Sequence, residues 1–414
     1  MEISLLFFCG IVSLFSVVIS FYNNSDVFSP SKIYILFNVI FYLDIYFGGY
    51  ELLTVVTYSI QCVLVLIFSI IDISRNRLTT TCNNGDVLSS KTILIIWLFT
   101  FVSIINQIMI INEFGGVLNY IANISLRVEY YRGKGYILFL NSIMATINVI
   151  YFSYLLSCKK RSIFQHTLFL VHFFIFVFMA LLSGSRSFLL MTILAEIIVY
   201  NYISKPLSIR NLLPFFFIIL GVAALIGGVR NSFDATDNKI TIKNDRVEAN
   251  ATHFKYGLIP LELIYTQNIN ELVMGTSYLA AITNFAPRTL FPNKFDSGGV
   301  AFTKLYTGDR WGGRSNLSTG AVAEGVLNFG LIPGILFGFV SLLFSYYLGI
   351  VLYKRMLTLI CYKNKYMSVI LYVYIILAIG RYPYSEFAYT YYTFILYVLI
   401  PVLLIKAVIR LKVF

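Results

Sequence analysis

Apolar stretches, each about 20 residues long, recur along this chain and constrain its fold more than any other feature. A helix of about that length spans the hydrocarbon core of a bilayer. The stretches lie at residues 3–22, 33–50, 52–71, 92–111, 136–157, 163–183, 187–203, 211–229, 320–352, 366–380 and 387–405. Only 12% of the residues are charged, about half the share in an ordinary soluble domain. We therefore expect an all-α polytopic membrane protein with about 11 transmembrane helices.

The basic residues indicate the orientation, because short cytoplasmic loops are enriched in lysine and arginine. If the N-terminus lies outside, the clusters KKR (159–161) and YKR (353–355) both fall inside. The opposite orientation would place both clusters outside. The net charge of +12 is thus mostly explained by topology, so the bilayer is an expected partner and nucleic acid is not.

One outer connection, residues 230–319, is far longer than the usual loop of about 4 to 6 residues. Its first part is polar. Its second part, 254–285, has apolar residues at helical spacing, so we expect short helices along the membrane surface. Its third part, 286–320, is rich in proline, glycine and aromatic residues and is interpreted as an ordered binding loop. We expect a single transmembrane domain, 1–414, that carries this loop.

Arginines stand at or near the outer ends of the expected helices: Arg186, Arg230, Arg288, Arg314 and Arg381. Each of them alone can be explained by snorkelling to the interface, and that alternative stays open. As a set they favour a site for a multiply charged anion, because the topology bias disfavours arginine in short outer segments such as those of Arg186 and Arg381. Guanidinium groups bind phosphate oxygens in pairs.

Glu324 stands out among the carboxylates, because the residues around it, GAVA and GVLN, are small or uncharged. Near a helix N-terminus it would be held ionised by the dipole and by an arginine, or its pKa would be raised by burial. Either state suits a proton acceptor for a substrate hydroxyl. A purely structural pair with Arg314 is the alternative, and Glu386 in RYPYSEF is a second candidate. Asp44 and Glu196, within apolar stretches, are interpreted as structural pairs.

Histidine and cysteine spacing argues against a metal site. The chain has no CxxC, and its three histidines lack ligand spacing. The segment GDRWGGRSN lacks the ending of a phosphate-binding P-loop. We expect no metal and no cofactor. Trp311, close to Arg314, is a candidate for stacking on a sugar ring.

Four segments, in this order, resemble motifs of the Wzy-type oligosaccharide repeat unit polymerases of bacterial O-antigen and capsule pathways. The segments are GGVLNYI with YYRGKG (115–135), SGSRS (183–187), APRTLFPNKFDSGG (286–299) and AEGVLNFGLIPGILFG (323–338). The similarity extends over most of the chain as topology, and over a much smaller part as motif.

The resemblance implies a metal-independent glycosyltransferase with a GT-C-like fold in the bacterial inner membrane, with its active site facing the periplasm. Such an O-antigen polymerase acts in lipopolysaccharide or capsular polysaccharide biosynthesis. It transfers a growing glycan from undecaprenyl pyrophosphate to an incoming lipid-linked unit and releases undecaprenyl pyrophosphate. The family also suggests a chain-length regulator as a partner.

Residue by residue, the resemblance implies that Arg186, Arg288 and Lys294 contact the pyrophosphate. Arg314 and Glu324 fall on the acceptor side, with Glu324, Arg288 and Arg314 as the catalytic candidates. Arg127 and Arg132 match the first outer loop and would hold phosphate. The remaining substrate-binding candidates are Tyr131, Arg230, Trp311 and Arg381.

One departure and two rival functions remain. Many relatives have an even number of spans with both termini inside. Either a twelfth span lies around 254–283 or arises by splitting 320–352, or the family tolerates variation in the number of spans. An O-antigen ligase is a rival, but it usually carries a loop histidine near an arginine, and His253 is far from the GGR and PRT elements. A flippase is the other rival, and it would show weak internal symmetry and charges at the membrane midplane.

Overall fold

A computed structural model describes residues 2–74, 90–122, 130, 135–158, 162–183, 186–212, 214, 221, 233–236, 239–242, 257–267, 271–286, 291, 293–307, 317–359 and 365–410. The regular structure in these residues is helical apart from one short β-hairpin, so the expected helical class is confirmed. The apolar stretches are helical over most of their length. The exception is 211–229, which lies almost entirely outside the described residues.

Seven helices in the described part of the chain are long and apolar enough to cross a membrane. They are Glu2–Asn23, Leu52–Ile71, Ser90–Glu113, Ile137–Ser157, Ile163–Leu182, Leu331–Leu359 and Phe387–Val408. Two shorter apolar helices, Ser187–Ile203 and Tyr366–Arg381, accompany them. These helices support a membrane-embedded protein, while the expected count of 11 or 12 spans stays a prediction.

Helix α1 (Glu2–Asn23) shows why these helices suit lipid instead of water. It buries the small side chains of Cys9, Ser16 and Ser20, and it exposes Phe7 to 71% and Leu14 to 66%. A helix on the surface of a water-soluble protein has the opposite pattern, with its large apolar residues buried. Small residues at helix contacts and large apolar residues outside are typical of membrane helices.

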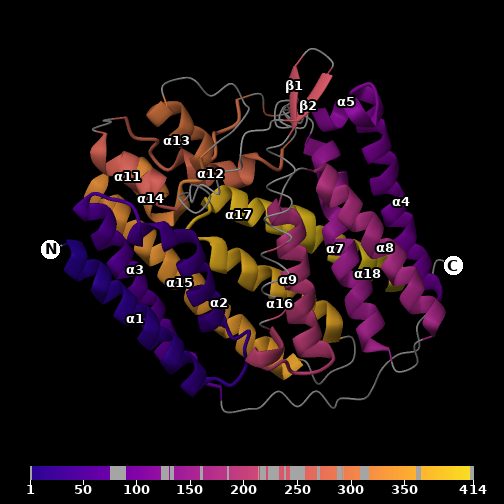
Figure 1. Cartoon of the computed structure of the whole chain (residues 1–414), viewed down its shortest axis with the longest axis horizontal. Coiled ribbons are helices and arrows are strands. Elements are labelled where there is room, and N and C mark those ends of the chain that lie inside the picture. Colours follow the sequence, from indigo (N-terminus) through magenta and orange to yellow (C-terminus); the bar gives the residue numbers. More distant parts are fainter. Residues whose placement is uncertain are drawn as a thin grey trace. The chain divides into compact units, whose positions relative to one another are not determined.

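The chain divides into two compact units. The first comprises Met1–Arg77, Asn250–Arg355 and Ile375–Phe394. Its helices are α1, α2 (Pro30–Tyr42), η1 (Leu43–Tyr46), α3 (Leu52–Ile71), α11 (Ile259–Thr266), α12 (Thr276–Thr283), α13 (Gly298–Thr307), α14 (Gly320–Phe329), most of α15 (Leu331–Leu359) and α17 (Phe387–Phe394). Within this unit α1 lies beside α3, and α14 is packed among α11, α12, α13 and α17 (Figure 1).

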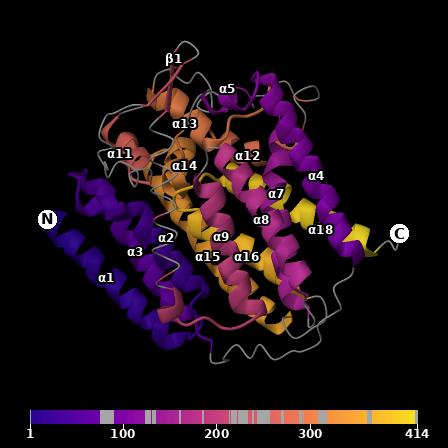
Figure 2. The ribbon, with the colours of Figure 1, turned by 45° about the vertical axis from the view of Figure 1, so that its right-hand side comes forward.

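The second unit comprises Leu78–Ala249, Met356–Tyr374 and Ile395–Phe414. Its elements are α4 (Ser90–Glu113), α5 (Val117–Ala122), α7 (Gly135–Ser157), α8 (Ile163–Leu182), α9 (Arg186–Ile203), the strands β1 (Phe233–Thr236) and β2 (Lys239–Ile242), most of α16 (Lys365–Arg381), the π-helical turn η4 (Ile395–Leu399) and α18 (Ile400–Arg410). Helix α7 packs against α4, α8 and α9 (Figure 2). The strands β1 and β2 pair antiparallel.

The long connection 230–319 contains the short helices expected in its second part, α11 and α12. Whether they lie on the membrane surface stays a prediction. The stretch 320–352, which the apolar pattern presents as one span, is divided at Gly330 into α14 and α15. Gly330 has a φ of 82°, a left-handed conformation that glycine adopts readily and other residues rarely.

Candidate functional site

Glu324 lies in the first unit, in the ten-residue helix α14. This helix starts at Gly320, where φ is 75° and an added Cβ would come within 2.3 Å of Pro383 O. Small residues at Ala321, Ala323 and Gly325 let the neighbouring elements approach closely. As a result the Glu324 side chain is fully buried, with 0% of the residue exposed.

Both carboxyl oxygens of Glu324 accept hydrogen bonds from distant parts of the chain. Ser277 Oγ of α12 donates to Oε1 at 2.9 Å, and the backbone N–H of Phe387, the first residue of α17, donates to Oε2 at 2.7 Å. The Asn328 amide donates to Ser277 Oγ at 2.8 Å and accepts from the Gly275 N–H at 2.8 Å. Glu324 therefore holds α12 and α17 against α14.

A second buried carboxyl, Glu386, directly precedes α17 and faces the start of α13. Its Oε2 accepts from the backbone N–H of Gly299, and Ser297 contributes a side-chain hydrogen bond. Gly298 stands against Glu324, since an added Cβ there would lie 2.6 Å from Glu324 Oε1. The sequence SGG at 297–299 thus contacts both carboxyls. Each carboxyl accepts from a backbone N–H at the start of a helix, α17 for Glu324 and α13 for Glu386.

Burial raises the pKa of both carboxyls, and both lie outside the helices that are long enough to span a membrane. For Glu324, loss of hydration comes first and the nearby charge of Glu386 second, and together they raise its pKa to about 8. The hydrogen bonds from Phe387 and Ser277 act in the opposite direction, because they stabilise the ionised form. The pair therefore favours proton retention at neutral pH.

This raised pKa predicts that the protein loses stability as the pH rises. The folded chain keeps a proton on Glu324 that the unfolded chain releases, so the free energy of unfolding falls between the ordinary value of 4.5 and about 8. One proton accounts for a slope of at most about 1.4 kcal/mol per pH unit. Unfolding in detergent between about pH 5 and 9 measures this slope, and Glu324→Gln should flatten it. Glu271→Gln, at an exposed position, is the matched control and should keep the slope. If the dependence of the unfolding free energy on pH were unchanged in Glu324→Gln, Glu324 would not be its source.

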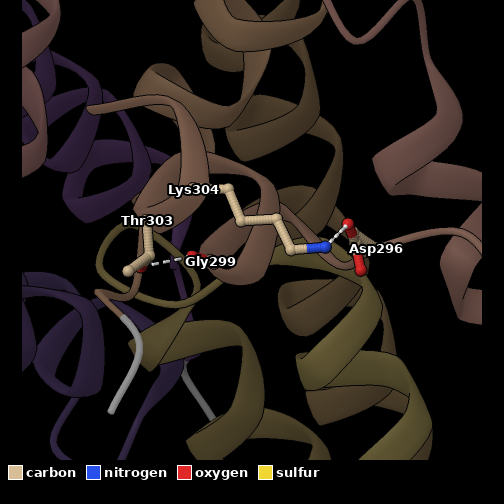
Figure 3. A network of polar contacts seen from close by, with 4 residues as sticks. All are labelled: Asp296, Gly299, Thr303 and Lys304. Atoms are coloured by element: carbon tan, nitrogen blue, oxygen red, sulfur yellow. Dashed lines mark hydrogen bonds and ion pairs between the residues drawn. The ribbon is translucent and has the colours of Figure 1, made fainter. Parts of the chain in front are cut away.

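Helix α13 itself is fixed by contacts around its second turn (Figure 3). Thr303 Oγ1 donates to Gly299 O at 2.7 Å and accepts from the Leu317 N–H at 2.9 Å. Lys304 Nζ lies 2.5 Å from Asp296 Oδ2, with both side chains about four-tenths exposed. An exposed ion pair of this kind contributes at most about 1 kcal/mol. The hydrogen bond from the Leu317 N–H to Thr303 ties the segment before α14 to α13, and Ser318 Oγ donates from the same segment to Tyr384 O at 2.9 Å.

Two of the basic residues singled out in the sequence are described in the first unit. Lys294 Nζ donates to Asn284 O at 3.3 Å, and the residue is partly buried. Arg381 is the last residue of α16, and its Nε is buried with no hydrogen-bond partner in the described part of the chain. In the sequence, Lys294 lies shortly before α13 and Arg381 lies shortly before α17.

The other candidates fall outside what the structure describes. Arg186 begins α9, but its side chain is not described. The remaining ones lie outside the described residues: Arg127, Tyr131, Arg132, Arg230, Arg288, Trp311 and Arg314. The contact between Arg314 and Glu324, and the gathering of arginines around an anion, therefore stay predictions.

Sequence reasoning did not find Ser277, Asn328 or Gly298 as neighbours of Glu324. Ser277 and the Phe387 N–H come from 47 and 63 residues away, and neither has a local pattern that indicates a contact. Two other buried carboxyls singled out in the sequence, Asp44 and Glu196, both have polar neighbours. Asp44 accepts from Tyr50 Oη at 2.9 Å, and Glu196 accepts from Asn148 at 2.6 Å.

Among the described residues, no group of three or more histidine, cysteine, aspartate or glutamate side chains could hold a metal ion. Comparison of the chain with protein-family models, with curated proteins and with solved structures gives no match. The function of the chain must therefore be inferred from the geometry of the site and from the sequence motifs.

Proposed function

We propose that the chain is a polymerase of lipid-linked oligosaccharide repeat units at the periplasmic face of a bacterial inner membrane. It transfers the growing glycan from undecaprenyl pyrophosphate to the terminal sugar of an incoming lipid-linked unit. The observation that carries this proposal is the pair of buried carboxyls, Glu324 and Glu386, held against the same SGG turn in a membrane-embedded helical protein. The order of the four sequence motifs supports the same class.

The transfer needs a base for the acceptor hydroxyl and positive charge for the leaving group. In its ionised form, Glu324 takes the proton from the hydroxyl, whose oxygen then forms the new bond to the anomeric carbon of the glycan. The bond from that carbon to the pyrophosphate breaks, and undecaprenyl pyrophosphate leaves with the bonding electrons. Arg288, Lys294 and Arg314 are the groups assigned to its growing negative charge.

Glu324 can serve as this base only if its present contacts open. Both oxygens are occupied, by Ser277 Oγ and by the Phe387 N–H, and Gly298 stands directly over the carboxyl. Displacement of residues 297–299 at the start of α13, together with rotation of the Ser277 hydroxyl, would free Oε1 and leave the Phe387 hydrogen bond in place.

The raised pKa of Glu324 also fits an exchange of protons during the reaction. A carboxyl with a pKa near the operating pH is well placed both to accept and to return a proton. Because Glu386 raises the pKa of Glu324 by its charge, the two carboxyls titrate as a pair instead of independently. A proton accepted by Glu324 therefore makes ionisation of Glu386 easier, since it removes the neighbouring negative charge.

Deletion of the gene tests this function against its rivals. We expect that the ladder of long surface polysaccharides disappears on a gel, while one repeat unit attached to lipid A core survives. Loss of all attached sugar, with lipid-linked polymer left in the membrane, would instead identify an O-antigen ligase. Accumulation of single lipid-linked units on the cytoplasmic side would identify a flippase. Restoration of the ladder by the intact gene is the control.

A further inference from the structure

A row of polar side chains crosses the interior of the second unit, inside helices that are otherwise apolar. Thr100 of α4, His172 of α8 and Asn148 of α7 each have 0% of their surface exposed, and Glu196 of α9 has 8%. A charged or ionisable group inside a membrane helix is costly, and it marks a functional site more often than a structural one. This row is independent of the carboxyl pair at Glu324, which belongs to the other unit.

The four side chains form one continuous chain of hydrogen bonds. Thr100 Oγ1 lies 2.8 Å from His172 Nε2, and His172 Nδ1 lies 2.8 Å from Asn148 Oδ1. Asn148 Nδ2 donates to Glu196 Oε1 at 2.6 Å. Thr100 also donates to Ile96 O at 2.9 Å, so its oxygen can accept a hydrogen bond from His172 Nε2.

This chain of hydrogen bonds can be satisfied in two ways with the same number of protons. In the first, His172 carries hydrogen on both ring nitrogens, Asn148 Oδ1 accepts from Nδ1, and Glu196 is a carboxylate that accepts from Asn148 Nδ2. In the second, the proton is on Glu196 and the Asn148 amide is turned over. Its oxygen then accepts from Glu196 and its nitrogen donates to His172 Nδ1. Since the two ends of an amide have the same shape, both orientations fit the same space.

From this geometry we infer that His172, Asn148 and Glu196 form a proton-binding site inside the membrane-embedded helices, in which one proton is shared between the imidazole and the carboxyl through the amide. Both arrangements carry no net charge, so neither leaves an uncompensated charge in the apolar interior. The proton that leaves the Glu196 oxygen is matched by the one that arrives on His172 Nδ1. The ligand of this site is therefore the proton.

The elements packed around this site bring few other titratable groups to it. Tyr151 of α7 meets the His172 ring edge to face at 5.3 Å, and Trp97 of α4 does so at 5.6 Å. Tyr374 of α16 lies near Glu196. From η4, Tyr397 offers its backbone oxygen to Thr146 at 2.5 Å. The other charged or imidazole groups of α4, α8, α9, α16 and α18 lie at or near the helix ends: Lys91, Glu113, His166, Arg186, Lys365, Arg381, Lys406 and Arg410.

More polar side chains continue from this site along α4 towards its C-terminal end. Ser103 donates to Leu140 O at 2.8 Å, Asn106 donates to Asn141 Oδ1 at 2.7 Å, and Asn141 donates to Gln107 Oε1 at 2.6 Å. Gln107 Nε2 is buried with no hydrogen-bond partner among the described residues. Thr100, Ser103 and Gln107 recur at helical spacing on one face, so the site has a polar approach from that end.

The test follows the proton with two probes at once. The first probe uses the double variant His166→Gln/His253→Gln, in which His172 is the only histidine left. In this full-length protein in lipid, ¹⁵N-histidine labelling reports on His172 alone. Infrared spectroscopy reports on the carboxylic acid band that Glu196→Gln removes. We expect both probes to titrate with one common midpoint. We also expect Glu196→Gln to weaken proton binding at His172 at least about tenfold, because the sites are coupled.

Asn148→Leu should separate the two midpoints while it keeps the branched shape of the side chain. Thr192→Val is the matched control, since Thr192 is buried one turn away on α9 and bonds only to Phe188 O among the contacts described. Unrelated midpoints in the protein with intact Asn148, or a His172 titration that ignores Glu196→Gln, would overturn the inference. So would a titration that appears only when sodium is present. A normal polysaccharide ladder in these variants would leave the inference intact, because it does not rest on the proposed function.

Discussion

Gly338→Leu should prevent α14 from packing against α15, so that little of the protein folds. A Cβ at Gly338 would lie 2.6 Å from Val322 Cα, and one at Gly334 would lie 2.3 Å from Val326 Cα. From the other side, a Cβ at Gly325 would lie 2.2 Å from Gly334 O. These contacts are with backbone atoms, which cannot turn aside as a flexible side chain can. The two helices must therefore separate to admit a side chain.

We expect this substitution to cost more than the about 1 to 3 kcal/mol of an ordinary overpacked core, because no rotamer relieves a backbone clash. The measurement is the yield of monodisperse protein in detergent and its unfolding temperature. Gly10→Leu is the matched control, since a Cβ at Gly10 in α1 meets nothing within 4 Å. Equal stability of the two variants would show that α14 and α15 do not pack as described. Under the proposed function, the Gly338 variant should also lose polysaccharide synthesis, since Glu324 lies on α14.

The helices of this protein follow from its sequence more closely than their arrangement does. The stretches 3–22, 52–71 and 163–183 match α1, α3 and α8 to within about one or two residues. A membrane leaves the backbone no partner except itself, so an apolar stretch of sufficient length must be helical. The positions of the apolar stretches therefore predict where these three helices lie.

The sequence allows 320–352 to be either one helix or two, because the apolar pattern is the same on both sides of Gly330. The structure has two helices, because Gly330 adopts a left-handed conformation and Gly325 approaches Gly334 closely. Glycines at 334 and 338 indicate that another helix comes close, but not which one. The partner is α14, which precedes α15 directly and folds back on it.

The small residues around Glu324 in the sequence single it out as an unusual carboxyl. No sequence pattern predicts which groups donate hydrogen bonds to it. The Phe387 N–H is a backbone donor, and every residue other than proline has one, so no residue type indicates it. Ser277 is one serine among many in the chain. The arginine-bearing segments are a different case, because most of the arginines expected around the anion lie outside the described residues.

Glu324→Gln should abolish the polysaccharide ladder while the protein remains folded. Glutamine has the same volume, and its carbonyl can still accept from the Phe387 N–H while its amide nitrogen donates to Ser277 Oγ. A neutral side chain also suits this buried position, because burial already favours the protonated form of Glu324. The variant should therefore be at least as stable as the natural protein above neutral pH.

Loss of a general base lowers the rate by about 100-fold to 10,000-fold, so the polymer should fall below detection on a gel. The level of the protein in membranes must be measured alongside, with Glu271→Gln as the exposed control. The two roles open to Glu324 give opposite results here. If it only holds α12 and α17 together, glutamine performs that task and a normal ladder appears. If it accepts the proton of the incoming sugar, a stable protein without polymerase activity results, because glutamine keeps the contacts and loses the basicity.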